Sequence, residues 1–278
     1  MSSPSQKLGT SEGLCAALEG LRARWNRREF VHPDPIEFLY NYDDARDREV
    51  AGLIAASLAY GRVKSILQSV GRVLERMGEP ARFLRETPDG SIARTFAGFR
   101  HRVTSGETLA LLLVGVKRVS ARFGSLEACF RDGLGGEDET VLPALTRFVD
   151  ELTAAAGACP VHLVSSPACG SACKRLHLYL RWMVRRDEVD PGGWTGVGPA
   201  KLVVPLDVHM HRIGRALGFT RRAQADGRAA LEVTAAFRAI APEDPVRYDF
   251  ALTRLGIRAD GNLAGFLAEC GVTERADA

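Results

Sequence analysis

The sequence lacks several features that define broad classes of protein. Its longest apolar stretches, residues 51–60 and 109–116, are much shorter than the about 20 residues of a membrane-spanning helix. The first ten residues are polar and contain no apolar core of a secretory signal. The six cysteines are scattered, and the single close pair, residues 169 and 173, does not make a zinc or iron–sulfur pattern. We therefore expect a cytoplasmic protein with reduced thiols and no metal or cofactor.

The composition is that of a globular protein. Hydrophobic residues make up 46% of the 278 residues and charged residues 26%, which excludes a disordered chain. The 28 glycines and 13 prolines follow no period, so a collagen-like or low-complexity protein is excluded as well. The length suits one large domain or two small ones.

Helical periodicity dominates the sequence. It predicts helices over segments 14–25, 34–39, 47–60, 63–77, 80–84, 108–119, 126–130, 141–155, 174–186, 207–217, 233–240 and 248–255, and around residue 266. Segments 161–164 and 202–206 are the only strand-like pieces, and Pro205 interrupts the second of these. The pattern therefore predicts an all-α protein.

The most informative segment is 171–218. Gly196 and Gly198 flank a valine in a tight turn, which glycines allow through positive φ, so that its amides could point at a phosphate. Asp207 precedes a helical pattern and is expected at its N-cap, where free amides stabilise a carboxylate. Read alone, these features describe an ordinary turn and an ordinary helix cap.

The net charge of +3 conceals two basic segments. Residues 60–131 contain 13 basic and six acidic residues, and residues 172–222 contain ten basic and four acidic residues. The rest of the chain is therefore acidic overall. This segregation favours nucleic acid as the partner, because clustered Lys and Arg neutralise phosphates.

At these residues the sequence resembles the helix-hairpin-helix DNA glycosylase superfamily. The motifs that carry this resemblance are the 196–199 turn, the run Pro205-Leu206-Asp207-Val208-His209-Met210-His211-Arg212-Ile213, the apolar segment 50–62 and the segment 248–257. The chain also resembles a bacterial family known as a domain of unknown function. That family has the same pattern of Lys174-Arg175-Leu176, then Leu180-Arg181-Trp182-Met183-Val184-Arg185, then Pro205-Leu206-Asp207.

The resemblance implies two catalytic residues. The aspartate of the superfamily corresponds to Asp207. Its lysine nucleophile corresponds best to Lys174, which lies 33 residues before Asp207, a spacing similar to that of archaeal 8-oxoguanine glycosylases. Lys201 lies too close to Asp207 for the usual layout. The chain departs from the superfamily in two ways, since the hairpin motif is only partly matched and no iron–sulfur cysteines follow.

The resemblance also implies an activity and a partner. We expect excision of a damaged base, with an oxidised purine as the first guess, from double-stranded DNA by a monomeric protein, and an abasic-site lyase step could follow. The expected DNA-binding residues are Tyr60, Gly61, Arg62, Arg175, Gly196, Gly198, His209 and Arg212. The expected base-pocket residues are Trp182, Trp194, Asp249 and Phe250, because aromatic rings stack on extruded bases.

The expected fold is two-lobed and all-α, with a helix-hairpin-helix-like element and a cleft between the lobes. One lobe covers residues 45–172, and residues 1–44 plus 173–278 form the other, which carries the hairpin and the Lys/Asp site.

Two alternatives remain at this stage. One is a helix-hairpin-helix protein that binds DNA without catalysis. The other is a metal-dependent hydrolase that uses Asp207, His209 and His211, which would share one face if they lay on a strand.

Overall fold

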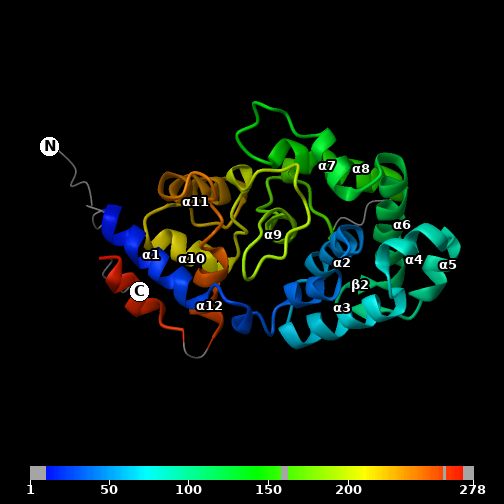
Figure 1. The fold of residues 1–278 in the computed structure, drawn as a ribbon, viewed down its shortest axis with the longest axis horizontal. Coiled ribbons are helices and arrows are strands. Elements are labelled where there is room, and N and C mark those ends of the chain that lie inside the picture. Colours follow the sequence, from blue (N-terminus) through cyan, green and yellow to red (C-terminus); the bar gives the residue numbers. More distant parts are fainter. Residues whose placement is uncertain (1–10, 158–161, 259–260, 272–278) are drawn as a thin grey trace.

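The computed structural model describes residues 11–157, 162–258 and 261–271, and these residues form an almost entirely helical molecule (Figure 1). The N-terminal elements are α1 (Ser11–Trp25), η1 (Arg28–Phe30) and η2 (Pro35–Asn41), where η marks a 3-10 helix. The central elements are α2 (Ala45–Ser57), α3 (Val63–Met77), α4 (Pro80–Glu86), α5 (Asp89–Thr95), β1 (Arg100–His101), β2 (Thr104–Ser105), α6 (Gly106–Phe123), α7 (Leu126–Asp132) and α8 (Leu142–Ala156). The C-terminal elements are η3 (Pro167–Cys169), α9 (Lys174–Val184), η4 (Pro199–Lys201), α10 (Val208–Ala216), α11 (Gly227–Ile240), α12 (Asp249–Ile257) and α13 (Leu263–Glu269). The predicted all-α class is therefore confirmed.

The ends of several helices follow from local sequence. Asp44 and Ser105 accept hydrogen bonds from the first-turn amides of α2 and α6. Gly78 and Gly124 end α3 and α6 with φ values of 65° and 91°, which glycine adopts without strain. Each of these boundaries can be found in the sequence because one residue decides it.

The helix predicted after Asp34 is instead the 3-10 helix η2. Its buried side chains include Ile36 and Leu39, which lie three residues apart and so share one face at three residues per turn. Helix α5 was missing from the prediction, because a seven-residue helix with one buried side chain, Ile92, leaves almost no periodic signal.

Two groups of helices lie on either side of α9 (Figure 1). Helix α1 packs on α12 and α13, and α10 packs on α11 and α12, so the N-terminal helix joins the C-terminal ones. On the other side α6 packs on α8, and α2 packs on α4, α7 and α9. One continuous set of buried apolar side chains runs through both groups. The lobe boundaries given above stay a prediction.

The strand expectations need correction. The described part of the chain contains one two-stranded antiparallel β-ribbon, β1–β2, which was not predicted. Residues 202–206 are buried and extended but pair with no strand, and the Val204 amide donates to Thr234 Oγ1 at 3.0 Å. Residue 161 of the other strand-like piece lies outside the described residues, and the remainder of that piece is not a strand.

Candidate active site at the starts of helices α9 and α10

Lys174 and Asp207 meet although 33 residues separate them in the chain. Lys174 is the first residue of α9, and Asp207 is the N-cap of α10. Lys174 Nζ lies 3.3 Å from Asp207 Oδ2, while Asp207 Oδ1 accepts a hydrogen bond from the Met210 amide at 2.8 Å. The lysine side chain is 37% exposed and the aspartate side chain 16%. One carboxylate oxygen therefore holds the helix, and the other faces an amine that solvent can reach.

The backbone before each residue sets this geometry. The buried, extended residues 202–206 carry the chain to Asp207, whose own φ and ψ are extended, as an N-cap requires. Cys173 precedes Lys174 with φ 45°, a left-handed conformation that is uncommon outside glycine. Its amide donates to Ser171 Oγ at 3.2 Å, and its buried thiol donates to the Ser165 carbonyl at the same distance. Lys174 thus begins its helix at a sharply turned, internally bonded corner.

Asp249 is a second acidic residue whose charge interacts with that of Asp207. It is the first residue of α12, is 2% exposed and accepts a hydrogen bond from Arg181 through Oδ2. Burial raises the pKa of the Asp249 carboxyl to about 6; the charge of Arg181 opposes this shift, and the negative charge of Asp207 adds to it. Its Oδ1 has no hydrogen-bond partner among the described residues. Asp249 is therefore a buried carboxyl whose pKa responds to the charge of Asp207.

Arg181 of α9 and Arg185, the residue that caps its C-terminus, form an ionic network. Both bind Asp190, and Arg185 also binds Asp187 and Asp244, each at 2.8 Å. Because buried charges are costly unless they are paired, this network fixes α9 relative to the loop that follows it.

Arg175 and Tyr60 brace the start of α9 against the end of α2. The Arg175 guanidinium donates to the Ser57 carbonyl at 2.5 Å and to the His162 carbonyl, and it lies 5.2 Å from the centre of the Tyr60 ring. Burial lowers the pKa of Arg175, an effect that the neighbouring Tyr60 opposes. These two predicted DNA-binding side chains are therefore partly buried and bonded to other parts of the protein.

The predicted phosphate cradle at Gly196 and Gly198 needs correction. Neither glycine has a positive φ; Gly198 has φ −79°. The amides of Thr195 and Gly196 both donate to Glu127 Oε1 at 2.7 Å. The Gly196 amide, which the pattern offered to a phosphate, is thus satisfied by a carboxylate from α7.

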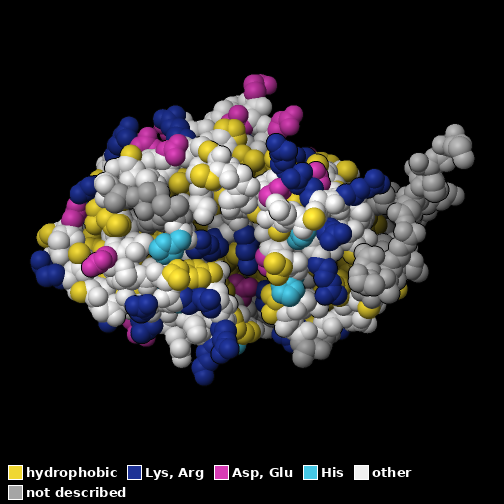
Figure 2. Space-filling model, turned by 180° about the vertical axis from the view of Figure 1, so that it is seen from behind, with side chains coloured by type: hydrophobic (Ala, Val, Ile, Leu, Met, Phe, Trp, Pro, Cys, Tyr) yellow, Lys and Arg dark blue, Asp and Glu magenta, His cyan; other side chains and the backbone are white. Residues whose placement is uncertain are grey.

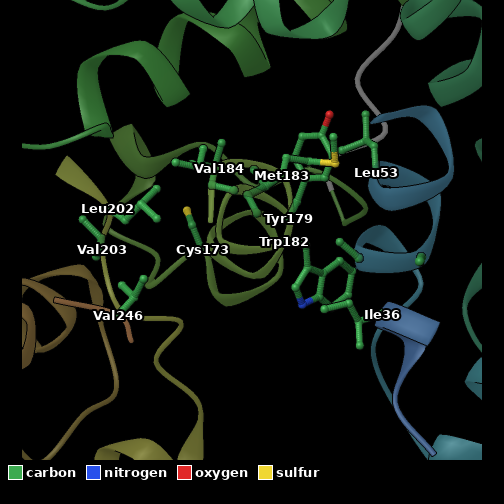
Figure 3. Close-up of a cluster of buried hydrophobic side chains, with 14 of the residues drawn as sticks. Ile36, Leu53, Cys173, Tyr179, Trp182, Met183, Val184, Leu202, Val203 and Val246 are labelled. Atoms are coloured by element: carbon green, nitrogen blue, oxygen red, sulfur yellow. The ribbon is translucent and has the colours of Figure 1, made fainter. Parts of the chain in front are cut away.

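The predicted base pocket is also wrong for its aromatic residues. Trp182, Trp194 and Phe250 are between 0% and 4% exposed, so none offers a ring face to an extruded base. Figure 3 shows Trp182 among core side chains near Ile36. Trp194 donates to Glu49 Oε2 at 3.1 Å, and Phe250 lies beneath the guanidinium of Arg254 at 4.2 Å. All three aromatic side chains are therefore part of the core, and Asp249 belongs to a buried ion pair with Arg181.

Asp207, His209 and His211 do not share one face, as the metal hypothesis required. Asp207 caps α10, His209 is exposed, and buried His211 is bonded through Nε2 to the Arg222 carbonyl at 3.0 Å. No cluster of three or more His, Cys, Asp or Glu side chains in the described residues could hold a metal ion. A helix turns residues i and i+2 in different directions, which explains the separation.

Several basic side chains are exposed and make no ion pair within the described residues. They lie at the start of α3, on the β-ribbon and on α10: Arg62, Arg100, Arg102, Arg212 and Arg215. Figure 2 shows a hollow near the middle of one face, bordered by Lys and Arg side chains with acidic side chains within it. Pockets of about 530 and 310 Å³ lie elsewhere: the first beside Asn26 and Asp187, the second beside His177 and Asp226.

The sequence pattern did not predict the β1–β2 ribbon. Its strands have two residues each, too short to show an alternating pattern. The clue in the sequence is the polar–apolar run from Arg100 to Thr104 just before a capped helix.

Fold and site together define an all-α protein with a lysine–aspartate pair at two helix starts. A family model matches residues 34–258, and the chain therefore belongs to the family described as "Protein of unknown function (DUF2400)". Searches of the curated proteins and of the solved structures found no match. The family description assigns no activity, so the glycosylase resemblance remains a prediction. No helix in the described part of the chain has the length and apolarity of a membrane span.

Proposed function

We propose that this protein is a DNA glycosylase that excises a damaged base and also cleaves the resulting abasic site, with Lys174 as the nucleophile and Asp207 as its proton acceptor. The observation that carries the proposal is the 3.3 Å approach of Lys174 Nζ to Asp207 Oδ2 at a partly exposed position. A carboxylate at this distance can take a proton from an amine and can stabilise positive charge on a sugar.

The proposed step uses the free amine of Lys174. Its lone pair forms a bond to C1′ of the extruded nucleotide, while the glycosidic bond breaks and its electron pair leaves with the base, which takes up a proton. Asp207 accepts the proton that the amine loses. Opening of the sugar then gives an iminium ion between Lys174 and C1′, and loss of the C2′ proton expels the 3′ phosphate.

The surface charge supports DNA as the substrate. Arg62 at the start of α3, Arg102 in the turn of the β-ribbon and Arg212 on α10 are exposed, and none of them is paired with an acidic side chain of the described residues. Such side chains gain free energy from phosphates because counterions are released. The cytoplasmic location, the monomeric state and the choice of an oxidised purine stay predictions.

Borohydride trapping tests the proposal. Wild-type protein mixed with duplexes carrying 8-oxoguanine or an abasic site should give a covalent protein–DNA adduct. Lys174→Ala should give none, whereas Lys201→Ala, which removes the lysine of η4 bonded to the Gly135 and Gly136 carbonyls, should leave the yield unchanged. DNA binding without adduct or excision across a lesion panel would leave the non-catalytic alternative. An adduct that persists in Lys174→Ala would show that another amine reacts.

A further inference from the structure

A pocket of about 310 Å³ is lined by the start of α11 and by the segment that leads into α9. Its buried lining is largely apolar, since Ala172, Val203 and Ala230 are between 1% and 9% exposed. The exposed part of its lining includes Arg228 and Leu231 of α11. An apolar interior with a few polar groups is the usual composition of a small-molecule site, and the volume lies within the range of such sites, about 300–1,000 Å³.

The walls of this pocket are fastened to one another through the backbone. The Gly227 amide donates to the Gly170 carbonyl at 2.9 Å, and Ser171 forms an isolated β-bridge with Asp226. A Cβ at Gly227 would lie 3.1 Å from the Ser171 carbonyl oxygen, so these two stretches of backbone are in close contact. The extended run 202–206 is bonded to α11 as well. The pocket is therefore preformed, and a ligand does not have to order its walls.

His177 gives the pocket an unsatisfied polar group. Its side chain lines the pocket and is 2% exposed, and its Nδ1 has no hydrogen-bond partner among the described residues. Burial lowers the pKa of His177 to about 4, so its ring is neutral near pH 7. A neutral imidazole has one donor and one acceptor nitrogen, and buried polar groups are nearly always hydrogen-bonded. A polar atom of a bound molecule can supply the missing partner.

Arg228 gives the pocket one positive charge that no acidic side chain neutralises. Arg222 and Asp226, which also line the pocket, form an ion pair at 2.6 Å. Arg228 is exposed and makes no ion pair within the described residues. Two arginines and one aspartate leave a net charge of +1 on the lining, because His177 is neutral. This charge complements that of a monoanion.

We propose that this pocket binds a small organic monoanion with an apolar body, such as an aromatic carboxylate or sulfonate. The apolar body packs among Ala172, Val203 and Ala230, the anionic group faces Arg228, and a polar atom bonds to the His177 ring. An arginine suits this role, because its guanidinium binds a planar anion through two parallel hydrogen bonds. The pocket binds its ligand whether or not the protein acts on DNA.

The test compares two fluorescent probes that share their rings and differ in charge. 8-Anilinonaphthalene-1-sulfonate is a monoanion, and N-phenyl-1-naphthylamine lacks the sulfonate. Wild-type protein should bind each probe saturably, with one molecule per chain. Arg228→Gln should weaken binding of the sulfonate about tenfold, because a charge-assisted hydrogen bond is lost, and should change binding of the neutral probe by less than about twofold. Arg186→Gln is the matched control, since Arg186 is exposed and unpaired in the described residues, and it should leave both affinities unchanged.

Proton NMR of the histidine rings locates the bound probe. The His177 signal, identified by its absence from the spectrum of His177→Leu, should move when the sulfonate is added. The signals of His32 and His209, which are exposed, should stay in place. Equal affinity of wild type and Arg228→Gln for the sulfonate would overturn the proposal. A His177 signal that does not move at saturating probe, or the lack of saturable binding by wild type, would overturn it too.

Discussion

The two carboxylate oxygens of Asp207 make different contacts. Oδ1 accepts from the Met210 amide and Oδ2 faces Lys174 Nζ. The two roles can be separated by substitution, since asparagine caps a helix about as well as aspartate but cannot accept a proton.

Asp207→Asn should therefore keep the fold and lose the chemistry. We expect the adduct to form about 100-fold or more slowly, the range lost with a positioned proton acceptor, with an unchanged free energy of unfolding. Asp207→Ala should lose the same rate and also about 1 kcal/mol of stability, because the cap is gone. Trapping kinetics and urea denaturation measure the two effects. A normal trapping rate in Asp207→Asn would remove Asp207 from the mechanism.

Buried His177 makes stability depend on pH. Burial lowers its pKa from 6.5 to about 4, and its Nδ1 has no partner among the described residues. Below pH 6.5 the unfolded chain binds a proton that the native protein does not take up until about pH 4. The free energy of unfolding should therefore fall as the pH drops through this window, by about 3 kcal/mol in total.

His177→Leu removes this titration and keeps the volume similar. Denaturation between pH 7 and pH 4 should show a shallower loss of stability in this variant than in wild type. Parallel curves for the two proteins would show that His177 is not the group responsible.

At the scale of elements, the contact between α6 and α8 depends on a glycine. A Cβ added at Gly115 would lie 2.6 Å from the Leu152 carbonyl oxygen and 3.3 Å from the Ala156 Cβ. The two helices can approach this closely only because position 115 has no side chain.

Gly115→Ala should therefore destabilise the protein by about 1–3 kcal/mol, the usual cost of overpacking. Gly20→Ala is the matched control, since Gly20 is helical and nothing lies within 4 Å of its added Cβ. The control should be stabilised by up to about 1 kcal/mol, because alanine favours helix more than glycine. Thermal and urea denaturation would measure both, and equal stability in the two variants would contradict the close contact.

At this scale the predictability of the elements follows their length. The long amphipathic helices α3, α6 and α8 repeat their apolar positions over several turns, so period and caps locate them. The β-ribbon and α5 are too short to repeat anything. The prediction of a phosphate-binding turn at Gly196 was wrong for a different reason. Glu127, which accepts a hydrogen bond from the Gly196 amide, lies 69 residues away in the chain.

At the scale of the whole molecule, some surface arginines are paired with acidic side chains and others are not. Arg82 is paired with Glu79 and Glu86, whereas Arg62 and Arg212 make no ion pair in the described residues. A count of basic residues in the sequence cannot distinguish paired arginines from unpaired ones.

DNA affinity should reflect the unpaired arginines. We expect the dissociation constant to rise steeply with salt, and the double variant Arg62→Ala/Arg212→Ala to lower the slope of log K against log salt by about 2. Arg82→Ala should leave the slope unchanged. Titration of a labelled duplex at several salt concentrations measures this, and an unchanged slope in the double variant would place the DNA on another face.

The sequence by itself determined what local forces decide. The apolar period specifies most helices, Asp207 predicts its own cap, and the matched motifs select Lys174 as its distant partner. Only the tertiary structure decided which side chains solvent can reach. Trp182 and Phe250 are core residues, and Arg175 is bonded to the Ser57 and His162 carbonyls, because burial and contacts depend on residues distant in the chain.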